Sequence, residues 1–586
     1  MRDSKLFALA KICQPEPSAM GWRGHPVGTL TETQFLIQHC MWICQTQLGM
    51  TPYWTQVAAA LGLCTGRVVE MNTGEGKTLT GLLATLLATS QGWPVHVITA
   101  NDYLAERDHA VAETVLDSLG ITHAALVAGQ LPVQRASILT SQVIFTTGKE
   151  LVFEALRDRL ALGDRRDPIR HAALRLSCTP EQRPYVHALG LAILDEADSV
   201  LIDEASTPCV ISGQGGHAWP LSDLSAALEL TMRLDPKRDL LWEGKNVQLS
   251  PRGLKQVHSY SDARLSNPIY RQTLVNMAVA ACYRYQRDVD YVVSDNKIII
   301  VDALTGRLMP DRRWEQGLHE LIEVKEGLEP SQAQQTLGKM TYPQFFRGYA
   351  LLSGMTGTAA EVQAELKKVY GLGLLKVAAR LPSARCFGGI KYAESLEAKY
   401  SAVLHSVREA IGRGQSVLIG TPSIEQCEAV SRRLLEGGIP HQCLDGRQDG
   451  DEAEQVAKAG QLKQVTVSTA VAGRGTDIPL SDEVRRAGGL HVIVFEPHFS
   501  SRLDRQLVGR CARQGDPGSY EMFAAKTDSL LEEAGFRPWG VPSEAAVMRV
   551  IARQQRKNEK HAMRRRSELS DFEKRRAEWL PFLKQD

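Results

Sequence analysis

The sequence lacks several features that mark particular classes of protein. It has no run of 18 consecutive apolar residues, so no transmembrane helix is predicted. It has no Cys-X-X-Cys pair and no cluster of cysteine with histidine, so a structural zinc site is not expected. It also has no internal repeat and no low-complexity tract. With 43% hydrophobic and 23% charged residues, the composition is that of a folded globular protein rather than a disordered chain.

The sequence also has almost no net charge, because 68 Lys and Arg stand against 67 Asp and Glu, a balance of +1. No overall field therefore attracts nucleic acid, although a local basic site is still compatible with this balance. Residues 5–13 are too short and too charged to predict a signal peptide. The 11 cysteines are odd in number and dispersed, which is typical of a protein from a reducing cytosol.

The 586 residues predict roughly three to five domains. Two series of short apolar runs alternate with amphipathic helices such as 79–88, which indicates an α/β fold with parallel sheets buried on both faces. The predicted strands are 67–71, 95–100, 143–146 and 191–194 in the first series, and 417–420, 465–468, 490–494 and 521–524 in the second.

Two other parts of the chain differ from this pattern. Residues 213–338 show little βαβ repetition and contain a predicted hairpin at 291–301 that turns at Asp295 and Asn296, so we interpret them as an inserted domain. After residue 526 the chain is helical and basic, with ten Lys and Arg against four Asp and Glu between Arg553 and Arg576. Such a segment is more often a solvated helix, or one packed along both lobes, than a nucleic-acid site.

A phosphate-binding loop is predicted between the first strand and its helix. Glycines let backbone N–H groups close around phosphates, and the N-terminus of the helix adds a favourable dipole. Lys77 can neutralise the β- and γ-phosphates of ATP, and the Thr78 hydroxyl can bind Mg²⁺. Met71 stands where the common pattern has its first glycine, as in the helicase-type variant. The candidate loop residues are Thr73, Gly74, Glu75, Gly76, Lys77 and Thr78.

Two acidic residues follow the strand at 191–194, at the end that should lie beside this loop. Asp195 can hold Mg²⁺ through water, and Glu196 can polarise the attacking water. Alone, Asp195-Glu196-Ala197-Asp198 is equally compatible with a solvated turn. With the phosphate loop upstream, the catalytic interpretation is favoured over a glycine turn and a polar strand end.

The second series carries the other half of the site. Residues 469–478 follow its strand at 465–468, and residues 506–515 contain Arg510 and Arg513. Two arginines three residues apart are expected to share one helix face, from which they can reach the γ-phosphate as arginine fingers. A solvated helix face is the alternative, and the surrounding glycines and glutamine argue against it. Together the motifs predict a two-lobed motor of the helicase superfamily with ATP between the lobes.

These motifs resemble one family, SecA, the bacterial preprotein translocase ATPase. The resemblance covers roughly 49–212, 287–372 and 412–525, and includes EMNTGEGKTLT, ITANDYLAERD, LDEADSVLIDEASTP, DVDYVVSDNKIIIVDALTGR, GMTGTA, STAVAGRGTDI and GRCARQGDPGS. NDYLAERD stands where a nucleic-acid helicase has its own strand-contacting motif, and GMTGTA where DEAD-box helicases have Ser-Ala-Thr. Both departures argue against an RNA helicase more firmly than the net charge does.

The resemblance implies roles for further residues. Met50, Tyr53 and Gln56 would frame the adenine, and Asp477 would lie near the ribose. Residues 354–359 would couple the state of the nucleotide to a domain that clamps polypeptide. Asp203 and Arg502 would form an ion pair that gates the two lobes; surface charges are the alternative at these two positions.

The fold implied is two RecA-like parallel-sheet motor domains of helicase superfamily 2 type, with an inserted α+β preprotein cross-linking domain and a short C-terminal helical segment. The expected divisions are an N-terminal lead-in at 1–48, the first nucleotide-binding domain at 49–212 and 339–380, the insert at 213–338, the second nucleotide-binding domain at 381–525 and a truncated helical scaffold at 526–586. The segment before the adenine motif is shorter than usual, and no two-helix finger, wing domain or cysteine-bearing tail has a counterpart. We therefore expect a shortened, accessory homologue.

The cofactors expected are ATP and Mg²⁺. The partners implied are an unfolded preprotein, the SecYEG channel or another membrane export partner, and a second copy of the chain. The expected location is the cytoplasm or the inner face of the cytoplasmic membrane. Two other functions stay open: a DEAD-like nucleic-acid helicase, supported by 553–576, and an ATP-switched polypeptide-binding module without full translocase activity.

Overall fold

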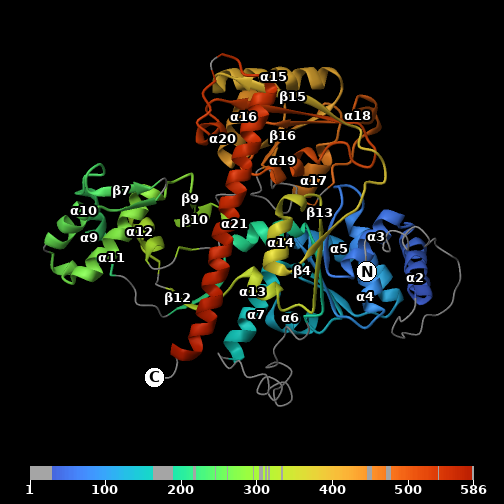
Figure 1. Cartoon of the computed structure of the whole chain (residues 1–586), viewed down its shortest axis with the longest axis horizontal. Helices are drawn as coiled ribbons and strands as arrows, with labels where there is room; N and C mark the ends of the chain where they lie inside the picture. Colours follow the sequence, from blue (N-terminus) through green and yellow to red (C-terminus); the bar gives the residue numbers. More distant parts are fainter. Residues whose placement is uncertain are drawn as a thin grey trace. The chain divides into compact units, whose positions relative to one another are not determined.

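The computed structural model describes most of the chain and divides it into two compact units (Figure 1). One unit contains Met1–Cys209 and Lys339–Asp586, and the other is Val210–Gly338. The described residues are 30–162, 189–214, 220–243, 246–260, 262–294, 296–301, 308–309, 313–314, 317–331, 334–444, 452–469, 475, 477–538 and 540–583.

The larger unit contains two parallel sheets, and the helices and strands around each are called here the first and second lobe. The sheet of the first lobe has seven strands, whose pairings are all parallel. The strands predicted near residues 67, 95, 143 and 191 are all confirmed. In spatial order the strands are β14 (Gly373–Lys376), β1 (Arg67–Glu70), β13 (Leu351–Thr356), β5 (Leu191–Asp195), β2 (Val95–Thr99), β4 (Val143–Thr147) and β3 (His123–Leu126).

Strand β13, which the sequence patterns did not reveal, lies between β1 and β5. Gly354 pairs in register with Val68 on one side and Leu194 on the other. A Cβ atom at Gly354 would lie 2.6 Å from the Cβ of Ala197, so only glycine allows this approach. The close contact brings the segment after β13 against the acidic segment that follows β5.

The helices of the first lobe cover a largely aliphatic sheet. Four of them share one hydrophobic core with the strands, because their alanine and leucine side chains are buried against Val69, Val97 and Ile193. Helix α4 confirms the helix predicted at 79–88. The four helices are α2 (Leu30–Leu48), α3 (Trp54–Leu63), α4 (Lys77–Thr89) and α5 (Asp102–Ser118), and α14 (Gln363–Tyr370) follows β13.

The second lobe is built on a parallel sheet of six strands. The four strands predicted in the second series are confirmed, and β15 and β17 complete the sheet at its two edges. In order the strands are β15 (Arg385–Ala393), β20 (Gly518–Ala525), β19 (Leu490–Val494), β16 (Ser416–Thr421), β18 (Val465–Thr469) and β17 (Gln442–Leu444). Helix α19 (Ser501–Val508) follows β19 and faces the first lobe through the contacts described below.

The smaller unit has its own hydrophobic core of helices and short antiparallel strands. The predicted hairpin is confirmed as β9 (Tyr291–Ser294) and β10 (Lys297–Val301), with Asn296 at φ 57° in its turn. Asp295 lies outside the described residues. The main helices of this unit are α9 (Leu221–Met232), α10 (Pro251–Ser259), α11 (Pro268–Val279) and α12 (Leu318–Lys325).

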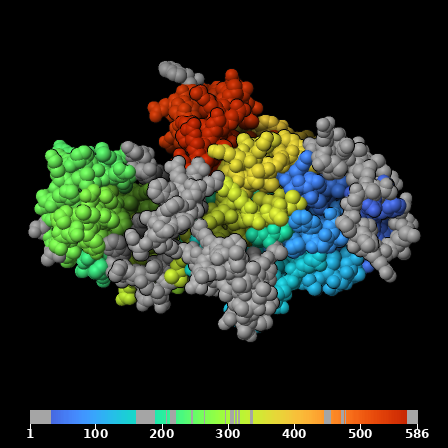
Figure 2. All heavy atoms as spheres, turned by 60° about the horizontal axis from the view of Figure 1, so that its bottom comes forward, coloured from blue at the N-terminus to red at the C-terminus, as the bar shows by residue number. Residues whose placement is uncertain are grey.

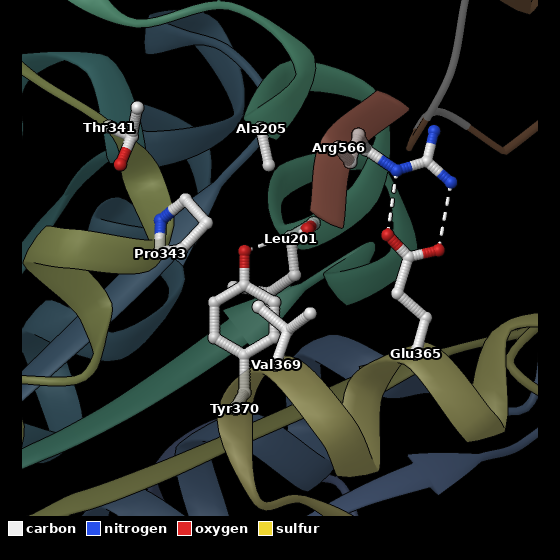
Figure 3. Close-up of a pocket in the computed structure, with 8 residues that line it drawn as sticks. All are labelled: Leu201, Ala205, Thr341, Pro343, Glu365, Val369, Tyr370 and Arg566. Atoms are coloured by element: carbon white, nitrogen blue, oxygen red, sulfur yellow. Dashed lines mark hydrogen bonds and ion pairs between the residues drawn. The ribbon is translucent and has the colours of Figure 1, made fainter. Parts of the chain in front are cut away.

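The basic C-terminal segment forms α21 (Glu544–Leu583), which packs along both lobes. Arg566 donates two hydrogen bonds, of 2.7 and 2.8 Å, to the carboxylate of Glu365 in the first lobe. Gln555 donates one of 2.7 Å to Asp504 in the second lobe. Figure 3 shows the Glu365–Arg566 pair beside a small cavity lined by Tyr370. In Figure 2 the C-terminal residues (red) lie against residues of the first lobe (yellow).

No helix in the described ranges is both long enough and apolar enough to cross a membrane.

Candidate nucleotide-binding site

The loop between β1 and α4 has the backbone that its glycines predict. Gly74 and Gly76 have φ of 86° and 79°, and Gly76 caps α4 in the left-handed region. A Cβ atom at Gly76 would lie 2.3 Å from Nε2 of Gln56, and one at Gly74 would lie 2.9 Å from Cβ of Arg513. The loop is therefore enclosed by α3 on one side and by the second lobe on the other.

Lys77, the first residue of α4, contacts the acidic end of β5. Its Nζ lies 2.5 Å from Oε1 of Glu196. Burial alone would lower the pKa of Lys77, but the carboxylates of Glu196 and Asp195 outweigh burial and the pKa is raised. Glu196 has φ 49°, an unusual backbone for a residue other than glycine, and such backbones often occur at functional sites. The structure thus brings Lys77 of the first motif together with Glu196 and Asp195 of the second.

A further carboxylate, which the sequence motifs did not single out, lies beside this group. The Thr78 hydroxyl is 3.5 Å from Oδ1 of Asp108 in α5. Burial raises the pKa of Asp195, Lys77 opposes this, and Glu196 and Asp108 raise the pKa further. Negative charge is therefore concentrated around one lysine, and this electrostatic environment favours a cation.

The donors at this position fit Mg²⁺ held jointly with nucleotide. Within the described ranges, no three or more His, Cys, Asp or Glu side chains are grouped to hold a metal ion. Mg²⁺ in nucleotide sites is commonly bound by one or two carboxylates, phosphate oxygens and water rather than by a cage of side chains. The Asp195 carboxylate and the Thr78 hydroxyl are oxygen ligands of the required kind.

Asp198, the last acid of the same segment, joins the two lobes. It is 0% exposed and accepts hydrogen bonds of 2.7 Å from two hydroxyls. One belongs to Thr356, the last residue of β13, and the other to Thr358, two residues later. It accepts two more of 2.7 Å, from Arg502 and Gln506 on α19 of the second lobe. With donors from both lobes, this carboxylate is a structural link rather than a group free to accept a proton.

The predicted gate residues Asp203 and Arg502 also meet across the lobes, where they form an ion pair. Arg502 is only 3% exposed, so the alternative of an exposed surface pair is wrong. One turn further along α19, Arg505 contacts Glu361 at 2.6 Å and Glu70 at 2.7 Å. Sequence reasoning missed Arg505, although its spacing from Arg502 places both on one face of α19.

The expectation that Arg510 and Arg513 share a helix face is wrong. Helix α19 ends at Val508, and Ala512 has φ 55°, which interrupts any continuation. Arg510 is half-buried in the turn after the helix, whereas Arg513 forms an ion pair with Asp477.

The turn that carries these arginines touches the phosphate loop directly. The Thr73 hydroxyl donates a hydrogen bond of 2.6 Å to the carbonyl of Gly509, and Nε of Arg513 donates to the same carbonyl at 3.2 Å. The predicted motif at 469–478 is only partly described, because residues 470–474 and 476 lie outside the described ranges. Arg107 of α5 donates to the carbonyl of Gly475 at 3.2 Å.

Of the three residues expected to frame adenine, Gln56 contacts the phosphate loop directly. Met50 and Tyr53 are 51% and 48% exposed, which leaves their side chains accessible. Gln56 is buried; its Oε1 accepts a hydrogen bond of 2.8 Å from the backbone N–H of Tyr53, and its Nε2 donates one of 2.9 Å to the carbonyl of Glu75. The amide of Gln56 is thus fixed between the exposed ring and the loop.

Comparison with protein families decides what kind of motor this is. A family model described as the SecA DEAD-like domain matches residues 29–367, and one described as the SecA P-loop domain matches residues 391–484 and 480–537. The chain belongs to the SecA family. The predicted resemblance is confirmed, and this SecA chain contains the DEAD-like and P-loop domains of an ATP-hydrolysing translocase.

Curated relatives agree with this assignment. The SecA chain is 40% identical over 505 residues to "Protein translocase subunit SecA 2" of Bordetella avium, covering 84% of this chain and 76% of that protein. It is also 40% identical over 504 residues to "Protein translocase subunit SecA 3" of Magnetococcus marinus, with the same coverage of 84% and 76%. Among solved structures, S. cerevisiae Dbp5 bound to RNA and ADP BeF3 matches with 14% identity and a TM-score of 0.43, over 88% of this chain and 97% of that one. A similarity that weak says nothing about what this chain binds.

Proposed function

We propose that this SecA chain couples ATP binding and hydrolysis to the movement or remodelling of unfolded polypeptide in protein export. One observation carries the proposal: the phosphate loop that precedes the Lys77–Glu196 pair of the first lobe is contacted by a turn of the second lobe, through the hydrogen bond from Thr73 to Gly509. A site shared between two lobes responds to nucleotide by opening and closing, and only such a differential response can do work on a bound chain.

At this site Lys77 neutralises the β- and γ-phosphates of ATP, and in doing so leaves its ion pair with Glu196. Glu196 then accepts a proton from the attacking water. Thr78 and Asp195 would hold Mg²⁺, which supplies charge neutralisation at the phosphates when it is bound. Arg510 and Arg513 place positive charge where the γ-phosphate develops negative charge.

The rest of the nucleotide is bound at the edge of the first lobe. Met50 and Tyr53 contact the adenine, and the fixed amide of Gln56 recognises its polar edge. Asp477 binds the ribose, and in the absence of such a contact its carboxylate pairs with Arg513. The remaining loop residues, Gly74, Glu75 and Gly76, supply backbone N–H groups for the phosphates.

The proposed client is an unfolded preprotein, and the proposed clamp for it is the inserted domain at 213–338. The proposed membrane partner is the SecYEG channel or another export component at the inner face of the cytoplasmic membrane, and a second copy of the chain is a further partner. Movement of the clamp follows lobe closure through the Asp203–Arg502 gate and the segment 354–359.

The test is an ATPase assay of the full chain with unfolded polypeptide, with RNA, and with neither. We expect stimulation by polypeptide and none by RNA, with Lys77→Ala as the control for background hydrolysis. Stimulation by RNA alone would replace the proposal with a nucleic-acid helicase. Intact ATP binding without any turnover would instead support an ATP-switched binding module.

A further inference from the structure

Arg380 lies in the segment that joins the two lobes, between β14 of the first and β15 of the second. Its guanidinium carbon is 4.3 Å from the centre of the Tyr53 ring, the distance of a cation packed directly on an aromatic face. Arg380 therefore covers one face of the exposed Tyr53 ring, although the two residues lie more than 300 positions apart in the sequence.

Three hydrogen bonds connect Arg380 back to Tyr53, so that the cation–π contact is part of a closed ring of four residues. The backbone N–H of Arg380 donates to Oε2 of Glu75 at 3.2 Å. The carbonyl of Glu75 accepts from Nε2 of Gln56 at 2.9 Å, and Oε1 of Gln56 accepts from the N–H of Tyr53 at 2.8 Å. Every member therefore touches two others, and the position of the Tyr53 ring is fixed from both its backbone and its face.

The spacing of this contact determines which face of the ring is available. Aromatic planes stack roughly 3.5 Å apart, so a base placed between Arg380 and Tyr53 would need about twice that separation. At 4.3 Å there is no room for one. A base that stacks on Tyr53 must therefore use the opposite face of the ring.

The neighbouring residue links the same segment to the second lobe. A Cβ atom at Gly515 would lie 2.8 Å from Cδ1 of Leu381, so Leu381 packs on the turn that follows Arg513. Two consecutive residues, Arg380 and Leu381, thus contact the first lobe at Tyr53 and the second lobe after Arg513.

We propose that Arg380 is a positioning residue of the nucleotide site, which holds the Tyr53 ring so that its free face and Gln56 together select the adenine base. The inference rests on the proposed ATP site and adds a residue that determines base selectivity. The Arg380 guanidinium packs on the Tyr53 ring, so its contribution is expected in the binding of the base.

The experiment measures the Kd of the full chain for ADP and GDP by calorimetry, and pyrophosphate binding as a probe without a base. Arg380→Ala should weaken ADP binding by about two- to fivefold, the usual effect of an exposed cation–π contact. It should also reduce the preference for ADP over GDP and leave pyrophosphate binding unchanged. Arg380→Lys, which keeps the charge but loses the plane, should lose less.

Two further variants separate positioning from general effects. Lys376→Ala removes an exposed cation from β14, four residues earlier in the chain, and should leave all three affinities unchanged. In a Tyr53→Ala background, Arg380→Ala should add no further loss, because the ring that it positions is gone. Unchanged ADP affinity and selectivity in Arg380→Ala, or a gain in affinity, would overturn the inference while the ATP site stands. Failure of the wild-type chain to bind ADP or pyrophosphate would overturn the ATP site itself.

Discussion

The contact between Arg502 and Asp203 allows a quantitative prediction about lobe opening. Arg502 crosses from the second lobe and places one nitrogen 2.7 Å from the fully buried Asp198 and the other against Asp203. The two substitutions Asp203→Asn and Arg502→Ala remove different parts of this arrangement. We expect both to raise basal ATPase activity and to reduce its further stimulation by polypeptide, because both weaken the closed state and let ADP leave faster.

The burial of each group sets the relative size of the two effects. Asp203→Asn keeps the shape of the side chain and leaves Arg502 paired with Asp198, so it should cost roughly 1.5–3 kcal/mol, the value of one charged hydrogen bond. Arg502→Ala leaves a buried carboxylate without its cation, which typically costs about 3–5 kcal/mol. Thr356, Thr358 and Gln506 still donate to Asp198, so we expect the lower end of that range. The difference, at most about 1.5 kcal/mol, corresponds to up to roughly tenfold more lobe opening in Arg502→Ala than in Asp203→Asn.

The assay is stopped-flow release of a fluorescent ADP analogue, with steady-state ATPase measured on the same samples. A double-mutant cycle of Asp203→Asn with Arg502→Ala reports the coupling between the two side chains. A charge swap would be a poor test, since Arg502→Asp would set a second carboxylate against Asp198. Unchanged ADP release and basal rates in both single variants, with normal thermal unfolding, would refute the gate.

The remaining predictions concern single positions. Lys77→Ala should remove the charge opposite the phosphates and strongly weaken binding of a fluorescent ATP analogue; unchanged affinity would show that the loop is misassigned. Glu196→Gln should bind ATP but hydrolyse it about 10²–10⁴-fold more slowly in a phosphate-release assay, since an amide cannot accept the proton. Arg510→Ala and Arg513→Ala should each reduce kcat more than ATP affinity. If kcat and ATP affinity fell by the same factor, these residues would act in ground-state binding instead. Burial lowers the pKa of His96 to about 4. The contribution of His96 to stability should therefore be nearly complete above pH 6.5 and fall as the pH drops towards 4, with roughly 1.5–2 kcal/mol of it lost between pH 6.5 and 5; in urea unfolding, the loss of stability over this interval should be smaller by that amount in His96→Gln.

The sequence predicted the parts of the fold that are continuous in the chain. Strands such as β2 and β18 are uninterrupted apolar runs, because both faces of a parallel sheet are buried. Strand β13 was not found in this way, since Leu351–Thr356 includes Ser353 and Gly354 and follows a long insertion. Its place between β1 and β5 depends on chain topology, which local patterns do not contain.

The same distinction applies to the site. Lys77 and Glu196 were predicted because each lies in a motif whose loop, strand and helix are adjacent in sequence. Arg380 and Arg505 were missed because their partners lie more than a hundred residues away, and the partners of Arg505 also depend on how the lobes meet. The helix expected across Arg510 and Arg513 failed for a local reason, since the backbone turns after Val508.

The late position of β13 in the chain has a consequence for synthesis on the ribosome. Asp195 and Leu351 flank the whole smaller unit, and on the order of 150 residues between them take on the order of ten seconds to translate at ~5–20 residues per second. During that interval β1 and β5 have no central strand to pair with, and their hydrogen-bonding edges stay exposed. The nascent first lobe is therefore a natural substrate for chaperones, whereas residues 210–338 contain their own core and can fold as soon as they emerge.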